Sequence, residues 1–358
     1  MNDHVAEDLR AAEQFRHLYT PPRIDGDFVG KHIITVEQFA HQDLVELFEG
    51  TAALRERVTR FDPDVVKLCS GRLMASLFFE ASTRTDMSFQ AAMRRLGGSV
   101  ISASNGIRFS SAYKGENLAD TVRAAGCFAD VIALRHPSVG SSYQAAYYLD
   151  RLNEQITTPT TLISGGDGIG EHPTQGLLDL FTIVDQKNGL DNLTITMVGD
   201  LLYGRTVHSL AKLIALYEAK NTRLCFVSPS SLRMPDTILD FLHKHDPNLT
   251  ICETADLYEV MGESDVIYWT RVQEERFIRR ADYEAVRDNF IMTPVVLNQA
   301  PRDVILMHPL PRKHEMGTPA DHDILDMNPR TVYFKEMENG MYVRMALLAK
   351  ILGAKDLF

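Results

Sequence analysis

The sequence has little cysteine, and what it has is scattered. Its four cysteines, Cys69, Cys127, Cys225 and Cys252, lie far apart and form no C-x-x-C pair. A disulfide framework or a cysteine-based zinc site needs a characteristic spacing of thiols. Neither is indicated, and we expect reduced cysteines in the core.

A long apolar run is also missing. No segment approaches the ~20 apolar residues that span a bilayer. The N-terminal residues MNDHVAEDLRAAEQF are polar and acidic where a signal peptide needs an apolar core. These absences predict a cytoplasmic protein that does not bind membranes.

Basic charge is scarce relative to acidic charge. The chain has 37 Lys and Arg against 48 Asp and Glu, a net charge of -11. No overall field therefore attracts nucleic acid or an anionic membrane. Any anionic ligand must be held by a local cationic site.

The chain has 358 residues, too many for one ordinary domain of about 150 residues. Short apolar runs alternate with helical patterns through both halves. This alternation predicts an α/β fold of two doubly wound domains, each with a central parallel β-sheet flanked by helices. We expect the strands at 73–79, 130–134, 160–164, 193–198, 223–227, 265–269 and 303–307.

Polar breaks set the expected domain limits. Residues 1–30 are polar and end in the turn-rich TPPRIDG, which favours a leader, helical in part or mobile, over a core element. The segment 187–192 (KNGLDN) separates the halves, and 340–352 has one apolar helical face that should dock on a sheet. We therefore expect a leader at 1–30, a first domain of 31–187 plus 333–358, and a second domain of 188–332.

The sharpest motif is FEASTRT at 79–85, between an apolar strand and a helix that Gly97-Gly98 should end. Three hydroxyls, one guanidinium and the unpaired amides of a helix N-terminus suit a phosphate. The alternative is an ordinary N-cap followed by a surface arginine. That alternative explains Ser82 or Thr83, but not the full row of Ser82, Thr83, Arg84 and Thr85.

Three further stretches carry weaker signals. Ser110 and Lys114 lie in a small-residue loop, where a solvated lysine is the default interpretation. Arg135 ends a strand, and α/β sheets place ligands at the carboxyl ends of strands. His172 and Gln175 share one face at the start of a helix and could both hydrogen-bond a carbonyl group. A capping histidine with a core glutamine is the alternative, and no second ligand on that face supports a metal.

The second half offers two arginines after strands. Arg205 follows a glycine-containing turn that lacks G-x-G-x-x-G, so a nicotinamide cofactor is not indicated. Arg205 and Arg271 could each bind a carboxylate, as a dicarboxylic ligand requires, or each could form a surface salt bridge. In MHPLPR at 307–312, prolines rigidify a turn whose carbonyls suit an NH₂ group, although it could equally be structural.

Together these motifs resemble the aspartate/ornithine carbamoyltransferase family, from about Gly30 to the C-terminus. Eight segments occur in the family's order. They are FFEASTRT, SSAYKGENLAD, ALRHP, HPTQGLLDL, VGDLLYGRTVHSL, YWTRVQEERF, MHPLPR and MYVRMALLA. The resemblance implies an enzyme without cofactor or metal that transfers the carbamoyl group of carbamoyl phosphate to the amine of L-aspartate, an early step of pyrimidine (UMP) biosynthesis.

The resemblance also implies roles for individual residues. Ser82, Thr83, Arg84 and Thr85 would hold the phosphate. Thr85, Arg135 and His172 would contact the carbamoyl oxygen, while Gln175 and the Pro309-Leu310 backbone would contact its amide. Arg205, Arg271 and Gln273 would bind aspartate. Ser110 and Lys114 would reach the active site of a neighbouring subunit, which implies a homotrimer with shared sites.

Two alternatives stay open in the sequence. An ornithine-specific enzyme is disfavoured, because that branch typically has His-Cys-Leu-Pro where this chain has a proline at 309. A non-catalytic subunit is disfavoured because every motif residue is present. Asp86 and Gln90 depart from the arginine and glutamate common in the family, and we expect both outside direct contact with substrate. Residues 1–30 and the long 138–160 segment are interpreted as contacts to a regulatory or pathway-enzyme partner.

Overall fold

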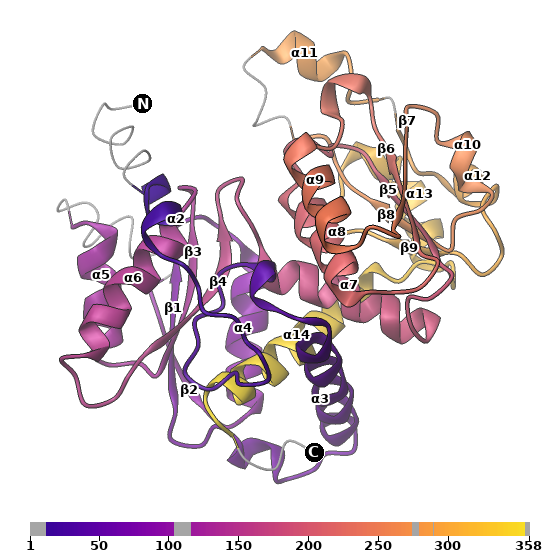
Figure 1. Cartoon of the computed structure of the whole chain (residues 1–358). Coiled ribbons are helices and arrows are strands. Elements are labelled where there is room, and N and C mark those ends of the chain that lie inside the picture. Colours follow the sequence, from indigo (N-terminus) through magenta and orange to yellow (C-terminus); the bar gives the residue numbers. More distant parts are fainter. Residues whose placement is uncertain (1–11, 104–115, 274–278, 289, 355–358) are drawn as a thin grey trace. The chain divides into compact units, whose positions relative to one another are not determined.

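The computed structural model describes residues 12–103, 116–273, 279–288 and 290–354 (Figure 1). The chain forms two compact units, Met1–Thr174 with Gly340–Phe358 and Gln175–Asn339. It passes between them inside helix α7 (Pro173–Lys187) and inside helix α14 (Tyr333–Ile351). The expected domain limits, at 187/188 and 332/333, fall at the end of α7 and at the start of α14.

Unit 1 is built on a four-stranded parallel sheet in the order β2-β1-β3-β4. The chain first runs outward from β1 to one edge and then from β3 to the other, so the strand order reverses between β1 and β3. The strands are β1 (Leu73–Phe78), β2 (Ser99–Ser102), β3 (Val131–His136) and β4 (Thr161–Asp167).

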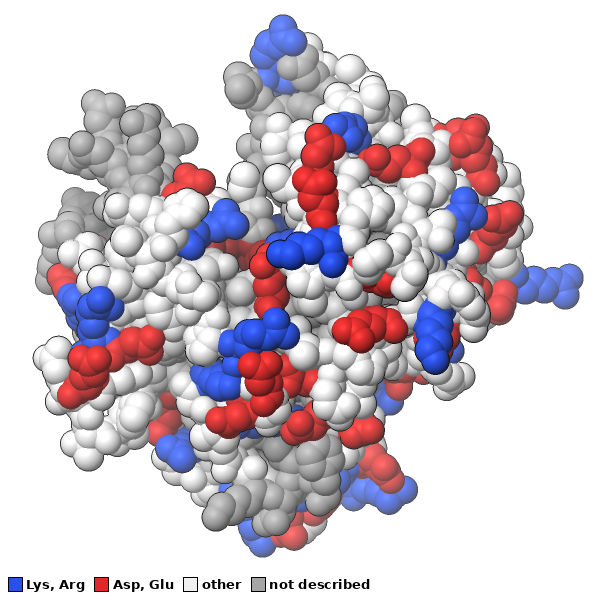
Figure 2. Space-filling model, viewed as in Figure 1, with Lys and Arg blue, Asp and Glu red and all other residues white. Residues whose placement is uncertain are grey.

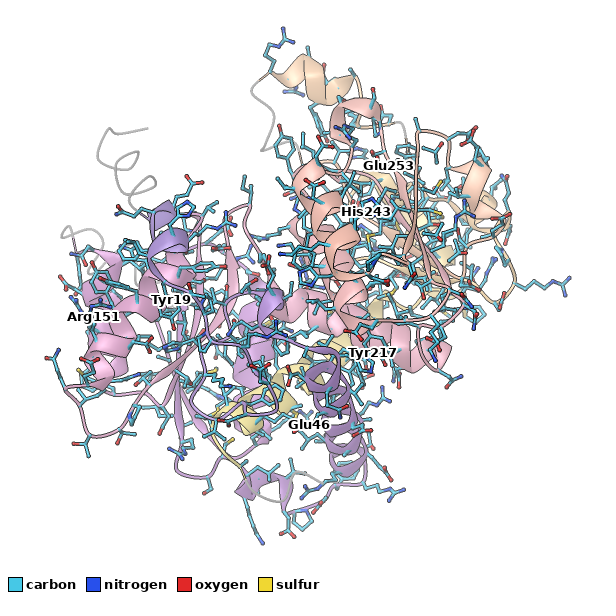
Figure 3. The ribbon with its side chains drawn as sticks, in the orientation of Figure 1. Tyr19, Glu46, Arg151, Tyr217, His243 and Glu253 are labelled. Atoms are coloured by element: carbon cyan, nitrogen blue, oxygen red, sulfur yellow. The ribbon has the colours of Figure 1, made fainter. Side chains whose placement is uncertain are left out.

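Helices flank both faces of this sheet, as expected (Figure 1). Ala75, Ile132 and Leu162 pack under α5 and α6 in one apolar core. The helices of this unit are α2 (Phe15–Leu18), α3 (His41–Thr59), α4 (Thr83–Arg95), α5 (Leu118–Gly126), α6 (Ser141–Asn153) and the second part of α14, with the short 3-10 helices η1 (Val36–Gln38) and η2 (Val65–Lys67). Lys350 on α14 donates to Glu46 on α3 at 2.6 Å, which ties these two helices together (Figure 3).

Unit 2 repeats the plan with a five-stranded parallel sheet in the order β7-β6-β5-β8-β9. Its order reverses between β5 and β8. The strands are β5 (Thr194–Val198), β6 (Arg223–Val227), β7 (Thr250–Thr254), β8 (Val266–Trp269) and β9 (Ile305–Met307). Val198, Trp269 and Leu306 belong to the apolar core on one face.

Two helices of unit 2 are amphipathic. They are α8 (Arg205–Tyr217), with 13 residues, and α9 (Asp236–His245), with 10. The remaining elements are α7, α10 (Tyr258–Met261), α11 (Arg280–Glu284), α12 (Pro294–Leu297), α13 (Pro319–Asp326), the first part of α14, and the 3-10 helices η4 (Ser230–Leu232) and η6 (His314–Met316). The predicted two-domain, parallel α/β fold is confirmed.

The segment before residue 31 corrects one expectation. We predicted a leader outside the core, but Phe15, Ile24 and Phe28 are buried. The Phe15 ring lies 5.2 Å from the Tyr147 ring and 5.6 Å from the Tyr148 ring, both on α6. The apolar residues of this segment have no regular period, so only their tertiary partners reveal that they are core.

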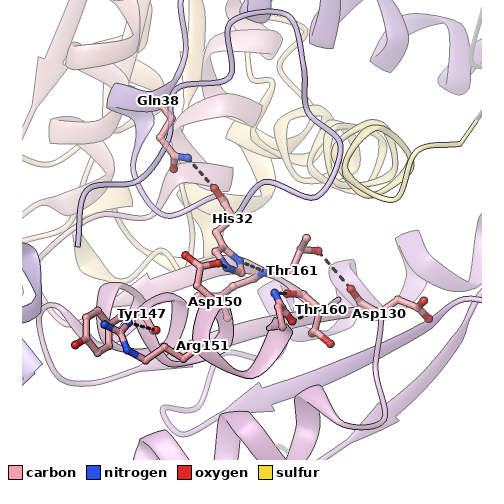
Figure 4. A network of polar contacts seen from close by, with 10 residues as sticks. His32, Gln38, Asp130, Tyr147, Asp150, Arg151, Thr160 and Thr161 are labelled. Atoms are coloured by element: carbon pink, nitrogen blue, oxygen red, sulfur yellow. Dashed lines mark hydrogen bonds and ion pairs between the residues drawn. The ribbon is translucent and has the colours of Figure 1, made fainter. Parts of the chain in front are cut away.

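A buried histidine fastens the end of this segment (Figure 4). His32 Nδ1 accepts from the Leu162 amide at 2.8 Å, so its ring proton lies on Nε2, which donates to Asp150 at 3.0 Å. The Gln38 amide donates to the His32 carbonyl at 2.7 Å. Burial and the charge of Asp150 raise the pKa of Tyr19, which also contacts this acid. The segment is thereby joined to both β4 and α6.

The cysteines are free thiols, and not all are in the core. Cys69 and Cys225 are buried and Cys252 is half-buried, but Cys127 is exposed. Cys127 is the C-cap of α5, where the chain leaves the helix at the surface. The expectation of a core position is wrong for this residue.

Acidic and basic side chains are interspersed on the face shown in Figure 2. None of the described helices is long and apolar enough to cross a membrane.

Candidate active site

The turn from β1 to α4 presents the predicted phosphate-binding row. Ser82 is the N-cap of α4, and the first amides of a helix have no carbonyl partner inside it. The Ser82 hydroxyl donates to the Thr85 hydroxyl at 3.0 Å, while Thr83 and Arg84 are exposed. Amides, hydroxyls and a guanidinium are therefore available at one helix N-terminus.

His172 joins this turn from the start of α7. Its Nε2 lies 3.5 Å from Thr85 Oγ1, and both residues are buried, at 4% and 8% exposure. Thr85 and His172 are 87 residues apart in sequence. The fold of unit 1 brings these two side chains together.

Arg135 ends β3 at the same edge of the sheet. Its strand partner is Phe78, the last residue of β1, so Arg135 lies where the strand order reverses. That position is where open α/β sheets bind ligands. Arg135 is 8% exposed, donates to the Gly165 carbonyl at 3.1 Å and forms a 2.8 Å ion pair with Glu80. Glu80, which had no predicted role, balances this buried charge.

The departures at Asp86 and Gln90 belong to one hydrogen-bonded group. Asp86 Oδ1 accepts from the Ser76 hydroxyl at 2.6 Å and from the Gln90 amide at 2.8 Å. Asp86 therefore faces β1, and Gln90 holds it one helical turn further on. A glutamate at 90 would place two carboxylates together, which explains why the two departures occur as a pair.

The second set of predicted residues lies at the reversal point of the other sheet. Arg205 opens α8 after β5, and Arg271 follows β8, the strand paired with β5. Both arginines and Gln273 are half-buried. The Gln273 side-chain amide donates to the Tyr203 carbonyl at 3.1 Å, so the two turns are in contact.

A buried acid missed in the sequence organises these two turns. Asp200 Oδ1 accepts from the Tyr203 amide at 2.9 Å, and Oδ2 accepts from the Gln273 amide at 3.3 Å. Burial raises the pKa of Asp200, opposed by these amides and by the charge of Arg271. The sequence signal was an acid directly after a strand and a glycine.

The turn after β9 is held by hydrogen bonds to His308. Leu310 adopts a left-handed backbone with φ 47°, and its amide donates to His308 Nδ1 at 2.9 Å. His308 Nε2 then donates to Glu315 at 3.1 Å. Burial lowers the pKa of His308, and hydrogen bonds from His308 and the Lys313 amide lower that of Glu315, so the pair is a neutral imidazole and a carboxylate.

Two further residues, Asp179 and Arg344, had no predicted role. Gln175 donates its Nε2 to Asp179 at 2.8 Å, one turn along α7. Arg344 on α14 donates to Ser88 of α4 at 3.0 Å and to Thr174 at 3.2 Å. Arg344 thus holds the starts of α4 and α7 together. An arginine on the otherwise apolar MYVRMALLA helix was the signal for it.

Ser110 and Lys114 lie outside the described residues. Within the described ranges, no group of three or more His, Cys, Asp or Glu side chains is arranged to hold a metal ion.

Comparison with known families matches both halves of the chain. Residues 31–185 match the carbamoyl-P binding domain of aspartate/ornithine carbamoyltransferase, and residues 191–351 match its Asp/Orn binding domain. The chain belongs to the aspartate/ornithine carbamoyltransferase family. The resemblance drawn from the motifs is confirmed.

Relatives in this family differ in length. The chain is 42% identical over 327 residues to the aspartate carbamoyltransferase catalytic subunit of Clostridium botulinum, covering 91% of this chain and 99% of that one. It is 45% identical over 327 residues, 91% of this chain, to the multifunctional protein CAD of Squalus acanthias, of which it spans only 14%. A solved aspartate transcarbamoylase from Trypanosoma cruzi, in complex with carbamoyl phosphate and aspartate, matches with a TM-score of 0.80 and 36% identity over 92% of this chain and 98% of that one.

Proposed function

We propose that this chain transfers the carbamoyl group of carbamoyl phosphate to the amine of L-aspartate, giving N-carbamoyl-L-aspartate and phosphate in pyrimidine biosynthesis. One observation carries the proposal. The N-terminus of α4, Thr85, His172 and Arg135 converge at the reversal point of the unit 1 sheet. These groups suit an acyl phosphate, in which a phosphate is bonded to a carbonyl group that must be polarised.

Carbamoyl phosphate binds at the α4 turn in this account. Ser82, Thr83, Arg84 and Thr85 hold the phosphate through hydroxyls, helix amides and one guanidinium. Thr85, Arg135 and His172 donate to the carbamoyl oxygen. Gln175 and the carbonyls of Pro309 and Leu310 accept from its NH₂ group.

Aspartate binds through the residues at the reversal point of the unit 2 sheet. Arg205 and Arg271 pair with its two carboxylates, and Gln273 adds an amide. Two arginines would repel the cationic side chain of ornithine, so this set favours a dicarboxylate. The local cations also overcome the net charge of -11 of the chain.

The reaction is a direct carbamoyl transfer. The neutral amine of aspartate attacks the carbamoyl carbon and forms a C–N bond, while the carbonyl electrons move onto oxygen. Donors preorganised around that oxygen stabilise the oxyanion, by about 3–4 kcal/mol for each well-placed group. The oxyanion collapses, the C–O bond to phosphate breaks, and the leaving phosphate accepts the proton of the amine.

The assembly follows from the same resemblance. We propose a homotrimer in which Ser110 and Lys114 of one subunit complete the site of the next. Mixing an inactive Lys114→Ala chain with an inactive Arg135→Met chain should then restore part of the activity. Mixed assemblies that stay inactive would contradict shared sites.

The substrate assignment is tested by a steady-state assay. Purified chain, carbamoyl phosphate and either L-aspartate or L-ornithine are incubated, and the carbamoylated product is identified by mass spectrometry. We expect N-carbamoyl-aspartate and no citrulline. Citrulline as the main product, or no product with either amine, would overturn the proposal.

A further inference from the structure

A buried chain of hydrogen bonds lies behind Gln175 in unit 2. Gln175 Nε2 donates to Asp179 Oδ1 at 2.8 Å, and the Tyr268 hydroxyl donates to Asp179 Oδ2 at 2.7 Å. Asp179 and Tyr268 are both completely buried. Burial and the nearby charge of Asp179 raise the pKa of Tyr268, so the phenol keeps its proton and can only donate here. Asp179 is therefore an acceptor on both oxygens.

Glu336, in the first turn of α14, is a second buried acid in this group. Its Oε2 accepts from the His308 amide at 3.0 Å, directly before the Pro309-Leu310 turn. Its Oε1 is buried, and no hydrogen-bond donor reaches it among the described residues. Asp179 is the neighbouring carboxyl, and burial together with that charge raises the pKa of Glu336 well above its ordinary value. This shift favours a protonated Glu336, whose Oε1 could then donate to Asp179.

These hydrogen bonds determine which end of the Gln175 side-chain amide faces outward. The two ends of an amide have nearly the same shape, but one only donates and the other only accepts. A carboxylate can only accept, so Asp179 fixes the NH₂ end against itself. The Oε1 of Gln175 is left as the end offered to a ligand, and an oxygen acceptor suits an N–H donor.

The same two acids connect Gln175 to the turn after β9. Gln175 bonds Asp179, Asp179 neighbours Glu336, and Glu336 holds the His308 amide. The elements proposed to accept from the carbamoyl NH₂ are thus linked through these two neighbouring acids.

We propose that Asp179 and Glu336 are positioning residues that hold Gln175 and the 308–311 turn as acceptors, and that they thereby set the preference for a carbamoyl NH₂ over the methyl group of acetyl phosphate. This inference rests on the proposed function. A site whose acceptors are fixed rejects an analogue that leaves them unpaired, because the buried oxygens lose water and gain no donor.

Two variants and one matched control test this inference. Asp179→Asn has one oxygen in place of two and can present an NH₂ group to Gln175, which turns the glutamine amide around. Glu336→Leu removes the proton donor and the acceptor for His308. Glu336→Gln is the control, because its NH₂ can donate to Asp179 while its oxygen accepts from the His308 amide.

The measurement is the KM for carbamoyl phosphate beside the inhibition constant of acetyl phosphate, each at the same aspartate concentration. For Asp179→Asn and Glu336→Leu we expect the KM to rise about tenfold or more while the acetyl phosphate constant stays within about twofold. Glu336→Gln should keep the ratio of the two constants within about twofold of the unmodified chain.

Other outcomes overturn the inference. Parallel weakening of both ligands would mean a structural role only, and unchanged constants would mean no role. A loss of preference in Glu336→Gln as large as in Asp179→Asn would show that Glu336 is ionised. Failure of the unmodified chain to make carbamoyl aspartate would instead reject the proposed function, before any variant is measured.

Discussion

The two sheets use the same position for different chemistry. In each unit the strand order reverses between two central strands, β1 and β3 or β5 and β8. Predicted ligand-binding residues lie at or after the ends of those strands, and His172 follows β4. In unit 1 these residues include Thr85, Arg135 and His172, which are all nearly completely buried. In unit 2 they are half-buried arginines and a glutamine arranged by one buried acid.

This difference suits the roles proposed for the two halves. Stabilising a developing oxyanion needs donors fixed in a dry environment, because they act more strongly there than in water. Binding the carboxylates of a free amino acid needs exposed charge that a substrate can reach. Topology sets where both half-sites lie, and burial sets their chemistry.

The largest effect is expected from removing the buried guanidinium of Arg135, which tests the role of burial in unit 1. Arg135→Met should lower kcat by about 10²–10³, because one oxyanion donor is lost and Glu80 is left without its cation. Initial rates at saturating substrates measure it. The control is Arg151→Met, an exposed arginine on α6 that lies over Tyr147 (Figure 3). Equal rates in Arg135→Met and the unmodified chain would break the comparison.

Removing one carboxylate oxygen of Asp200, which arranges the two turns of unit 2, tests the site proposed for aspartate. Asp200→Asn cannot accept from both the Tyr203 and Gln273 amides, since one oxygen becomes an NH₂ group. We expect the KM for aspartate to rise about tenfold, by analogy with other buried unsatisfied groups. The exposed Asp191→Asn, which removes an acceptor for the Lys220 amide, is the control. A rise confined to the KM for carbamoyl phosphate would contradict the division.

The acid in the first turn of α4 should oppose phosphate binding. Asp86→Asn removes a negative charge next to Thr85 but keeps an oxygen for Ser76 and Gln90. We expect the KM for carbamoyl phosphate to fall about two- to fivefold, because repulsion between the two anions is removed. Asp120→Asn, in the first turn of α5, is the matched control. An unchanged or higher KM would show that Asp86 is screened from the phosphate.

The smallest expected effect concerns acid stability of unit 1. Burial lowers the pKa of His136 from 6.5 to about 4. The unfolded chain therefore takes up a proton as the pH falls below about 6.5, the folded chain does not until about 4, and stability is lost across that window. His136→Asn keeps an acceptor for the Ser138 amide and removes the titration.

Melting temperatures at pH 7.5 and 5.5 measure this effect. His136→Asn should lose about 2–4 °C less than the unmodified chain over that change. The exposed His243→Asn on α9 should lose as much as the unmodified chain (Figure 3). A greater loss in His136→Asn would contradict the sign of the argument.

The sequence predicts the strands that carry an apolar run, and it misses those that do not. β1, β3, β4, β5, β6, β8 and β9 lie where the runs predicted them. β2 and β7 lie at sheet edges with mostly exposed or half-buried residues, so no apolar run marks them. β4 and β9 also lie at edges, but they are buried and carry apolar runs. An exposed edge strand is specified by its neighbour and by backbone hydrogen bonds, and neither can be read from a local pattern.

The candidate site divides in a similar way. Residues on one continuous motif, such as Ser82 to Thr85, could be predicted because the strand–turn–helix pattern is local. The partners of those residues could not. Glu80 meets Arg135, and Glu336 meets the His308 amide, only because separate segments fold together. Single acids without a local pattern give no signal of such partners.

The central claim is that the two arginines of unit 2 bind aspartate and that the α4 turn of unit 1 binds the phosphate of carbamoyl phosphate. The most direct test is to measure both KM values in Arg271→Met. The account predicts that the KM for aspartate rises about 100-fold, as for the loss of one partner of a charge-assisted pair, while the KM for carbamoyl phosphate stays within about twofold. A large rise for carbamoyl phosphate with no change for aspartate would contradict it.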